Sequence, residues 1–253
     1  MDLIEGPGTV DVEAALDALA DRYARAGGAG IEVLNLIGGR AEGLLERLPT
    51  VVRDRLQDAT GSALEHAMRA AHASRSVVPD QSSWLNRAAS AAMGAAGGAG
   101  GLPTALAELP VTTTLLLRVI QGVAVEHGFD ANSKAVQYDC VTVFAAAGPL
   151  EADDGADLGF LSVRVTLTGT AVQGLIARVA PRLATVLGQK LAAQTVPILG
   201  AVAGAATNYA YTSYYQEMAH VQFGLRKLAI DADVSLETLV EKLRLRVSHR
   251  ALV

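Results

Sequence analysis

Apolar residues recur at helical spacing along most of this chain. Over residues 11–26 they return every three or four positions, which marks one face of a helix. Asp11 stands where an N-cap is expected, and the Gly27-Gly28 pair predicts the end of this helix. The same criterion predicts further helices over 49–73, 102–128, 132–147, 169–190 and 231–250.

Local signals refine several of these helices. Pro49 is placed to open the helix over 49–73, and Asn132 or Ser133 to cap the helix that follows. Pro110 predicts a boundary or a kink, and His127-Gly128 the end of a segment that is apolar nearly all round and should be buried.

Two stretches interrupt the helical pattern. Residues 151–159 (EADDGADLG) predict an acidic loop that divides the chain into two sub-halves. Residues 161–168 alternate apolar and polar, which by periodicity favours a strand. Because no second alternating segment offers a partner strand, we interpret 161–168 as helical. We therefore expect one all-α domain over 1–253, a bundle of about eight to ten helices.

Two segments, 88–107 and 191–216, contain no charged residue and are long enough to span a bilayer. Both are rich in Ala and Gly rather than in Leu, Ile or Phe. The second also holds amides and hydroxyls, which are costly in hydrocarbon. We favour Gly/Ala-rich helices packed closely at the centre of the bundle over membrane spans.

Composition narrows the function classes. Apolar residues make up 51% of the 253 positions and aromatics only 4%, which is typical of close-packed helices. The net charge of −5 gives no basic footprint for nucleic acid. Cys140 is the only cysteine, which excludes an intramolecular disulfide and fits a reducing cytosol, and the N-terminus lacks the pattern of a secretory signal.

The stretch from Lys190 to Arg226 concentrates small residues and polar groups. Gly200 and Gly204 are four residues apart, so they share a helix face that lets another helix approach closely. Asn208 continues this face and needs hydrogen-bond partners, and one interpretation is that it and the tyrosine hydroxyls bond to buried backbone groups or to one another. We interpret the stripe as a close crossing that opens into a polar, ligand-binding pocket. The residues assigned to that pocket are Gly200, Gly204, Asn208, Tyr211, Tyr214, Tyr215, Glu217 and His220.

Glu217 and His220 admit several interpretations. Glu-x-x-His is half of a di-iron motif, but it occurs here only once, so we expect no metal. The pair would serve as general acid and base if the carboxylate raised the pKa of the imidazole. No nucleophile motif accompanies it, and we assign no catalytic residue and no cofactor. A helix-surface or interhelical salt bridge, for example to Arg226 or Lys227, is the simpler interpretation.

Part of the chain resembles the EcsC family. The likeness lies in residues 197–202 (PILGAV), Asn208-Tyr209, Tyr215 and Phe223, with a Gly/Ala run before Leu102. It covers roughly residues 30–230 and implies a bacterial, mostly helical protein without known catalytic residues. The best-known relative is encoded beside an ABC transporter, so the resemblance implies a role with a membrane or a membrane partner.

We therefore expect a non-enzymatic cytoplasmic protein, peripheral on the inner face of the membrane. It would associate with the membrane surface or a membrane transporter complex and bind lipid or another apolar ligand between its helices. One alternative is a small-molecule hydrolase or metal-dependent enzyme that uses Asn208, Glu217 and His220. Another is a structural oligomerisation module.

Overall fold

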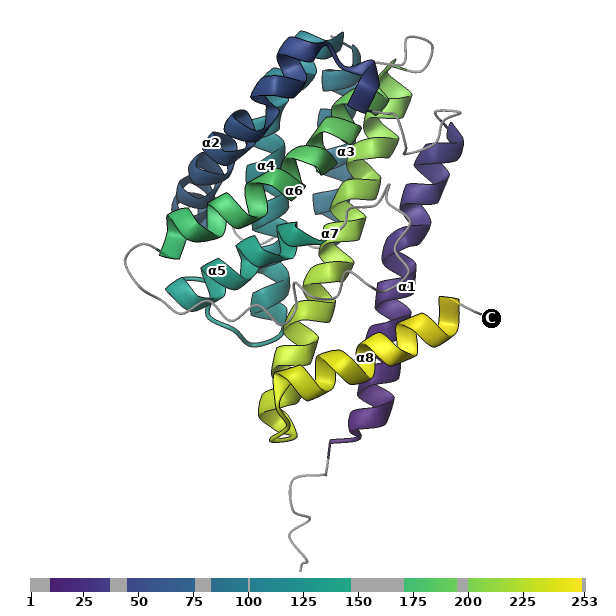
Figure 1. The fold of residues 1–253 in the computed structure, drawn as a ribbon, viewed down its shortest axis with the longest axis vertical. Coiled ribbons are helices and arrows are strands. Elements are labelled where there is room, and N and C mark those ends of the chain that lie inside the picture. The colour runs from purple at the N-terminus through teal and green to yellow at the C-terminus, as the bar shows by residue number, and fades with distance from the viewer. Residues whose placement is uncertain are drawn as a thin grey trace, which may run out of the picture.

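The computed structural model describes residues 10–36, 45–75, 83–99, 101–146, 171–194 and 200–251 (Figure 1). Within these ranges the chain forms eight α-helices and two 3₁₀ helices, without a strand, packed as a single bundle. This confirms the all-α prediction. The elements are α1 Val12–Leu36, η1 Leu45–Arg47, α2 Thr50–Arg75, α3 Ser83–Ala99, α4 Gly101–Glu126, α5 Lys134–Thr142, η2 Val143–Ala145, α6 Ala171–Gln194, α7 Gly200–Asp231 and α8 Leu236–Ala251.

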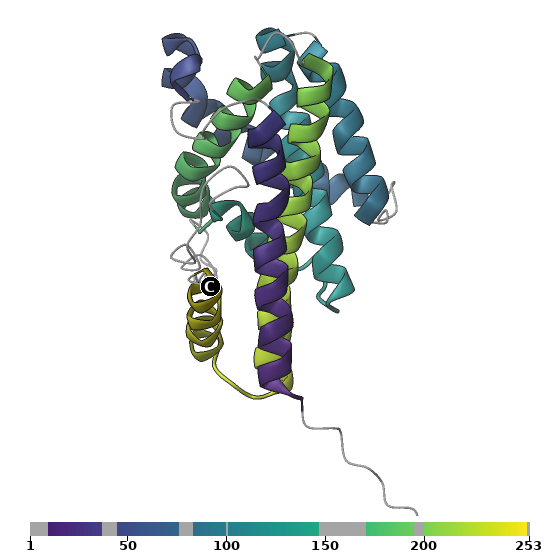
Figure 2. The ribbon, with the colours of Figure 1, turned by 90° about the vertical axis from the view of Figure 1, so that its right-hand side faces the viewer.

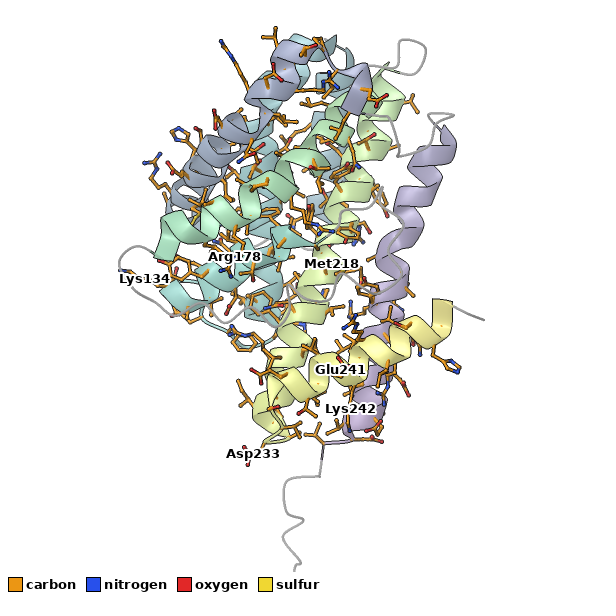
Figure 3. The ribbon with its side chains drawn as sticks, viewed as in Figure 1. Lys134, Arg178, Met218, Asp233, Glu241 and Lys242 are labelled. Carbon is orange, nitrogen blue, oxygen red and sulfur yellow. The ribbon has the colours of Figure 1, made fainter. Side chains whose placement is uncertain are left out.

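The 32-residue helix α7 is the element on which the others are assembled. It packs against α1 and α3, and it also contacts α4, α6 and α8. Figure 2 shows α1 lying beside α7. Helices α2, α4 and α6 pack on one another away from α1. Because α7 touches partners on several sides, its side chains are buried around most of its circumference, as Met218 in Figure 3 illustrates.

Most predicted helix ends are confirmed by capping contacts. The backbone N–H of Ala14 donates to Asp11 Oδ1 at 3.0 Å, and that of Val136 donates to Ser133 Oγ at 3.2 Å. Gly128 follows α4 with φ of +84°, a conformation that glycine adopts without strain. The sequence thus predicted these ends because each depends on one or two local residues.

The predicted helix end at Gly27-Gly28 and the predicted helix boundary at Pro110 are wrong. Helix α1 continues through Gly27-Gly28 to Leu36. Glycine costs only about 1 kcal/mol in a helix, and α1 packs along α7 with Tyr23 and Ala26 buried, which outweighs that cost. Helix α4 runs through Pro110, where proline removes a single backbone donor and buried Leu109 and Leu116 hold both sides in the core.

Helix α4 is the buried apolar helix that its composition predicted. Leu116, Leu117 and Ile120 are at most 1% exposed. Among the described residues it is also the one helix with a window apolar and long enough to cross a membrane, Leu109–Glu126, of which 56% is buried inside the protein. Packing in the bundle is sufficient to explain this window. The loop over 151–159 and the helix over 161–168 that we predicted lie outside the described residues.

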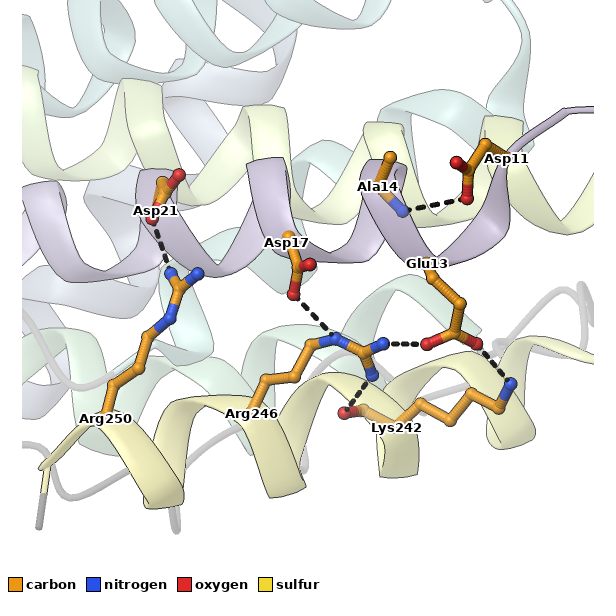
Figure 4. Close-up of polar contacts among 8 residues, drawn as sticks. All are labelled: Asp11, Glu13, Ala14, Asp17, Asp21, Lys242, Arg246 and Arg250. Carbon is orange, nitrogen blue, oxygen red and sulfur yellow. Dashed lines mark hydrogen bonds and ion pairs between the residues drawn. The ribbon is translucent and has the colours of Figure 1, made fainter.

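The first and last helices are joined by ion pairs along their exposed sides (Figure 4). Lys242 Nζ lies 2.9 Å from Glu13 Oε1, Arg246 Nε lies 3.0 Å from Asp17 Oδ1, and Arg250 Nη1 lies 2.5 Å from Asp21 Oδ1. Arg246 also pairs with Glu13. The three acids and the three bases each recur every four residues, so they line facing sides of α1 and α8. We call these six residues the α1–α8 ladder.

Candidate functional site

The small-residue stripe of α7 meets α3, as the predicted close approach requires. A Cβ added to Gly94 of α3 would lie 2.1 Å from the carbonyl oxygen of Gly204 and 2.7 Å from Asn208 Cγ. No side chain fits between these backbones, so only glycine is compatible with the crossing. Gly200 begins α7 one turn before Gly204.

Asn208 forms hydrogen bonds to buried backbone across this crossing, as one of the two interpretations predicted. Its side-chain amide donates to the carbonyl of Ser90 at 2.9 Å, and Ser90 Oγ donates back to the carbonyl of Asn208 at 3.2 Å. Thr212 Oγ1 donates to Ser90 Oγ at 2.6 Å. All three residues are at most 1% exposed, and a buried polar side chain is stable only when such partners satisfy it. We call Ser90, Gly94, Gly204, Asn208 and Thr212 the α3–α7 crossing.

The tyrosines of the predicted site face other helices. Tyr211 donates its hydroxyl to the carbonyl of Val186 in α6 at 2.9 Å. The rings of Tyr214 and Tyr215 pack edge to face at 5.3 Å, and Tyr215 also meets Phe144 of η2 at 5.1 Å. All three tyrosines are buried. Their contacts tie α7 to the α5–α6 side of the bundle, whereas Asn208 ties it to α3.

Glu217 pairs with α1 and not with the residues that we predicted. Arg22 Nη1 lies 2.9 Å from Glu217 Oε2, and Arg25 Nη2 lies 4.0 Å from the same oxygen. The predicted interhelical salt bridge is confirmed, but its partner is not one of the two residues named as examples, since Arg226 pairs with Asp139 of α5 and Lys227 with Asp231 one turn further along α7. Sequence spacing favoured neighbours on α7, whereas the arginine that binds Glu217 lies 195 positions away.

His220 contacts the end of α4. Its Nδ1 lies 3.1 Å from Nε2 of His127, and its Nε2 lies 3.8 Å from Glu126 Oε2. Burial, followed by the positive charges of Arg22 and His127, lowers the pKa of His220 from its ordinary 6.5 to about 4. The pKa of His127 is also lowered, by burial and then by Arg22 and Lys227. The raised pKa that the acid–base interpretation requires is therefore wrong. We call Arg22, Glu126, His127, Glu217 and His220 the histidine cluster.

The predicted site residues are thus brought to three separate places. Gly204 and Asn208 lie at the α3–α7 crossing, the tyrosines face α6 and η2, and Glu217 with His220 lies against α1 and α4. No group of three or more His, Cys, Asp or Glu residues that could hold a metal ion is present in the part of the chain that the structure describes. Within the same residues we find no arrangement that supplies a nucleophile with an activating base.

Comparison with known proteins places this helical arrangement in a family. The sequence model of the EcsC protein family matches residues 40–228, which is about three quarters of the chain. The chain belongs to the EcsC protein family. No curated protein and no solved structure was found to match it.

The EcsC region, residues 40–228, contains the α3–α7 crossing together with His127 and His220. It does not include the terminal helices α1 and α8. It begins after α1, which ends at Leu36, and ends before α8, which starts at Leu236. The α1–α8 ladder and Arg22 therefore lie outside the matched residues. The two helices outside the matched residues, α1 and α8, pack on each other and on α7.

Sequence reasoning missed Ser90, Thr212, His127 and Arg22. Ser90 had a usable signal, since it stands four residues before Gly94 as Gly204 stands four before Asn208. A glycine and a polar residue four positions apart, present on two segments with almost no charge, indicate two helix surfaces that face each other. Arg22 and His127 had no comparable signal, because each lies on a segment with many charged or capping residues.

Proposed function

We propose that this EcsC protein is a non-enzymatic cytoplasmic protein that docks on the inner face of a membrane through the outer side of α3 and the first half of α7. The observation that carries the proposal is an exposed face with almost no charge. Helix α3 has one charged residue, Arg87, and α7 has none before Glu217. Ala89 and Ala92 are exposed on α3, and Val202 and Tyr209 of α7 are 60% and 45% exposed.

The chemistry of this face suits a lipid interface better than water. Arg87 lies over the ring of Tyr209, 6.0 Å from its centre, and donates to Gln216 Oε1 at 3.1 Å. Tyrosine and arginine side chains have apolar bodies and polar ends, which places them at the level of lipid headgroups. The alanines beside them offer flat apolar backbone surface to acyl chains. We name Ala89, Ala92, Val202 and Tyr209 the uncharged face, which Arg87 borders at Tyr209.

Lipid is proposed on this outer face and not between the helices. Asn208 and Tyr211, which we expected to line an internal pocket, already bond to Ser90 and Val186. A ligand between α7 and its neighbours would have to displace these buried hydrogen bonds. The best-known relative in the EcsC family is encoded beside an ABC transporter, which supports docking at a membrane with a transporter complex as the partner.

The test is cosedimentation with neutral phosphatidylcholine vesicles and with cell membranes. Val202→Asp should reduce binding by about tenfold, because a carboxylate at an apolar interface costs at least about 1.4 kcal/mol. Val51→Asp is the matched control, since Val51 is 68% exposed on α2, away from the uncharged face. Equal binding by the two variants, or wild-type protein that ignores both vesicles and membranes, would contradict the proposal.

A further inference from the structure

Helix α8 has the composition of a helix that lies on a charged surface. Its buried stripe is apolar and consists of Leu239, Val240, Leu243 and Val247. Around this stripe stand Lys242, Arg244, Arg246, His249 and Arg250, while its acids, Glu237 and Glu241, lie in the first two turns. Leu245, between two arginines, is 64% exposed. An amphipathic helix with a basic polar side is the type that binds anionic bilayers in the interface plane.

In the folded chain the basic side of α8 is occupied by the carboxylates of α1. The three acids of the α1–α8 ladder are 58% to 61% exposed, so their ion pairs stand in water and are screened by salt. Side-chain hydrogen bonds from Lys242 and Arg246 lower the pKa of Glu13, so that carboxylate stays charged to a lower pH than an unpaired glutamate does. The row of carboxylates presents the same kind of partner as a row of lipid phosphates.

We propose that α8 is a releasable membrane-binding arm, held against α1 by the α1–α8 ladder until an anionic phospholipid surface takes the place of the α1 carboxylates. This proposal rests on the docking function above. Docking concentrates the protein at the membrane, where headgroup phosphates compete for Lys242, Arg246 and Arg250 of α8, which lies across α1 and α7 from α3 (Figure 2). The acyl region receives the apolar stripe that α1 and α7 cover in the free protein.

The exchange is feasible because the membrane offers an equivalent for each interaction that α8 makes with the bundle. A ligand shifts a conformational equilibrium only by its differential affinity for the two states. Here the free energy of the ion pairs is replaced by attraction to anionic headgroups, and burial against the bundle is replaced by burial in lipid. The turn before α8 is short, and Asp233 within it has φ of 52°; release of α8 requires a backbone change at this turn only.

Two triple variants test this with opposite expected results. Glu13→Gln/Asp17→Asn/Asp21→Asn removes the ladder but keeps the basic side of α8, and it should bind anionic vesicles severalfold more tightly than wild type. Lys242→Gln/Arg246→Gln/Arg250→Gln removes the same ion pairs and should bind about a hundredfold more weakly, from about fivefold for each basic residue near the surface. The vesicles are phosphatidylcholine with and without phosphatidylglycerol.

The pair of variants separates membrane binding from a structural role. Both lose the same ion pairs, so a purely structural ladder changes vesicle binding by both in the same direction or not at all, and either result would overturn the proposal. Arg53→Gln/Arg55→Gln/Arg178→Gln removes three exposed positive charges from α2 and α6 and should bind as wild type does. If this control variant bound anionic vesicles as weakly as the α8 variant does, binding would depend on general charge attraction, and the proposal would be overturned.

Hydrogen exchange gives a second measurement. Amides of α8 should exchange faster than those of α7 in the acid-neutralised variant, and anionic vesicles should change α8 exchange in the wild type, whereas neutral vesicles should not. Unchanged α8 exchange on anionic vesicles would overturn the proposal. Failure of the docking function is distinguishable, because it appears as equal binding of Val202→Asp and Val51→Asp on neutral vesicles.

Discussion

The α3–α7 crossing and the α1–α8 ladder both join two helices through residues spaced four apart, yet they depend on different physics. At the crossing the backbones touch, the hydrogen bonds are neutral and every member that has a side chain is buried. In the ladder the partners are long charged side chains, and the carboxylates are more than half exposed. Shape fixes the first contact and charge fixes the second.

The difference separates the matched EcsC region from the two helices that lie outside it. The crossing lies within residues 40–228, and both halves of the ladder lie outside. A contact that depends on shape tolerates almost no substitution and responds little to salt. A screened contact between charged side chains responds to salt and pH. The chain thus combines a rigid central pair with a terminal pair that solution conditions can loosen.

The largest expected effect is at Gly94. Gly94→Ala places a methyl group 2.1 Å from the carbonyl oxygen of Gly204, so the helices must separate, and the free energy of unfolding should fall by about 3 kcal/mol. Gly122→Ala in α4 is the control, because nothing lies within 4 Å of the added methyl group. It should be neutral or stabilise by about 0.5–1 kcal/mol. Urea unfolding followed by circular dichroism measures both, and equal stability of the two variants would contradict the crossing.

The hydrogen bonds of the crossing come next. Asn208→Ala leaves the buried carbonyl of Ser90 without its side-chain donor and should cost about 1–3 kcal/mol. Asn132→Ala, at an exposed position before α5, should change stability by less than about 0.5 kcal/mol. The loss at Asn208 should be the same in about 0.01 M and about 1 M salt, since no charge is involved. If the loss of stability in Asn208→Ala disappeared in high salt, the crossing would depend on charge as the ladder does, which would contradict this prediction.

The sequence predicted the crossing because its information is local. Gly204 and Asn208 share a helix face by spacing alone, and the glycine run of α3 offered the matching surface. The positions of most helices were predictable for the same reason, because the spacing of apolar residues is also local information. The helix ends at Gly27-Gly28 and Pro110 were predicted wrongly because packing along α7 and within the core outweighs a propensity cost of a few kcal/mol at most.

The partners of charged residues could not be predicted. Glu217 had two basic residues within ten positions, Arg226 and Lys227, and still pairs with Arg22. The ladder joins residues about 229 positions apart, and nothing in the spacing of either helix identifies the other. Charges of both signs occur on most exposed helix faces, so pattern reasoning cannot select among them. The packing of α1 beside α7 decides which charged residues pair, because it brings Arg22 next to Glu217.

The histidine cluster lies between the two regions, since Arg22 of α1 reaches the EcsC part of α7. In the unfolded chain His220 titrates near 6.5, whereas in the folded protein its pKa is about 4. Between these values the unfolded state binds more protons, so stability falls as the pH drops. We expect a loss of about 1–2 kcal/mol from about pH 7 to about pH 5, reduced from the full linkage value by solvent on the Glu126 side.

His220→Gln should remove most of this pH dependence while keeping a polar side chain beside His127. Glu126, His127 and Arg22 surround His220, so part of the remaining slope belongs to His127, whose pKa is also lowered. Exposed His249 on α8 provides the control, since His249→Gln should leave the pH dependence unchanged. Urea unfolding at the two pH values measures the slope. A wild-type protein more stable at the lower pH would contradict the lowered pKa.

The smallest effect is expected in the ladder, and its sensitivity to solution conditions is the informative part. Arg246→Gln should lower the midpoint of thermal unfolding by a few degrees in about 0.01 M salt and by less in about 1 M salt, because the Asp17 and Glu13 carboxylates are exposed and screened. Folding lowers the pKa of Glu13 below its ordinary 4.5, so its contribution is present above that pH and is lost as the pH falls through the lower folded value.

The side chain of Arg246 is only 21% exposed, so its aliphatic stem also packs between the helices. Arg246→Met keeps most of that stem and removes the charge. If charge holds α8, both substitutions should lose the salt-dependent part of the midpoint, and Arg244→Gln, exposed on the same helix, should not. If Arg246→Met were as stable as wild type at low salt, the stem and the apolar stripe would hold α8. A membrane could then release the helix only by competing for that stripe.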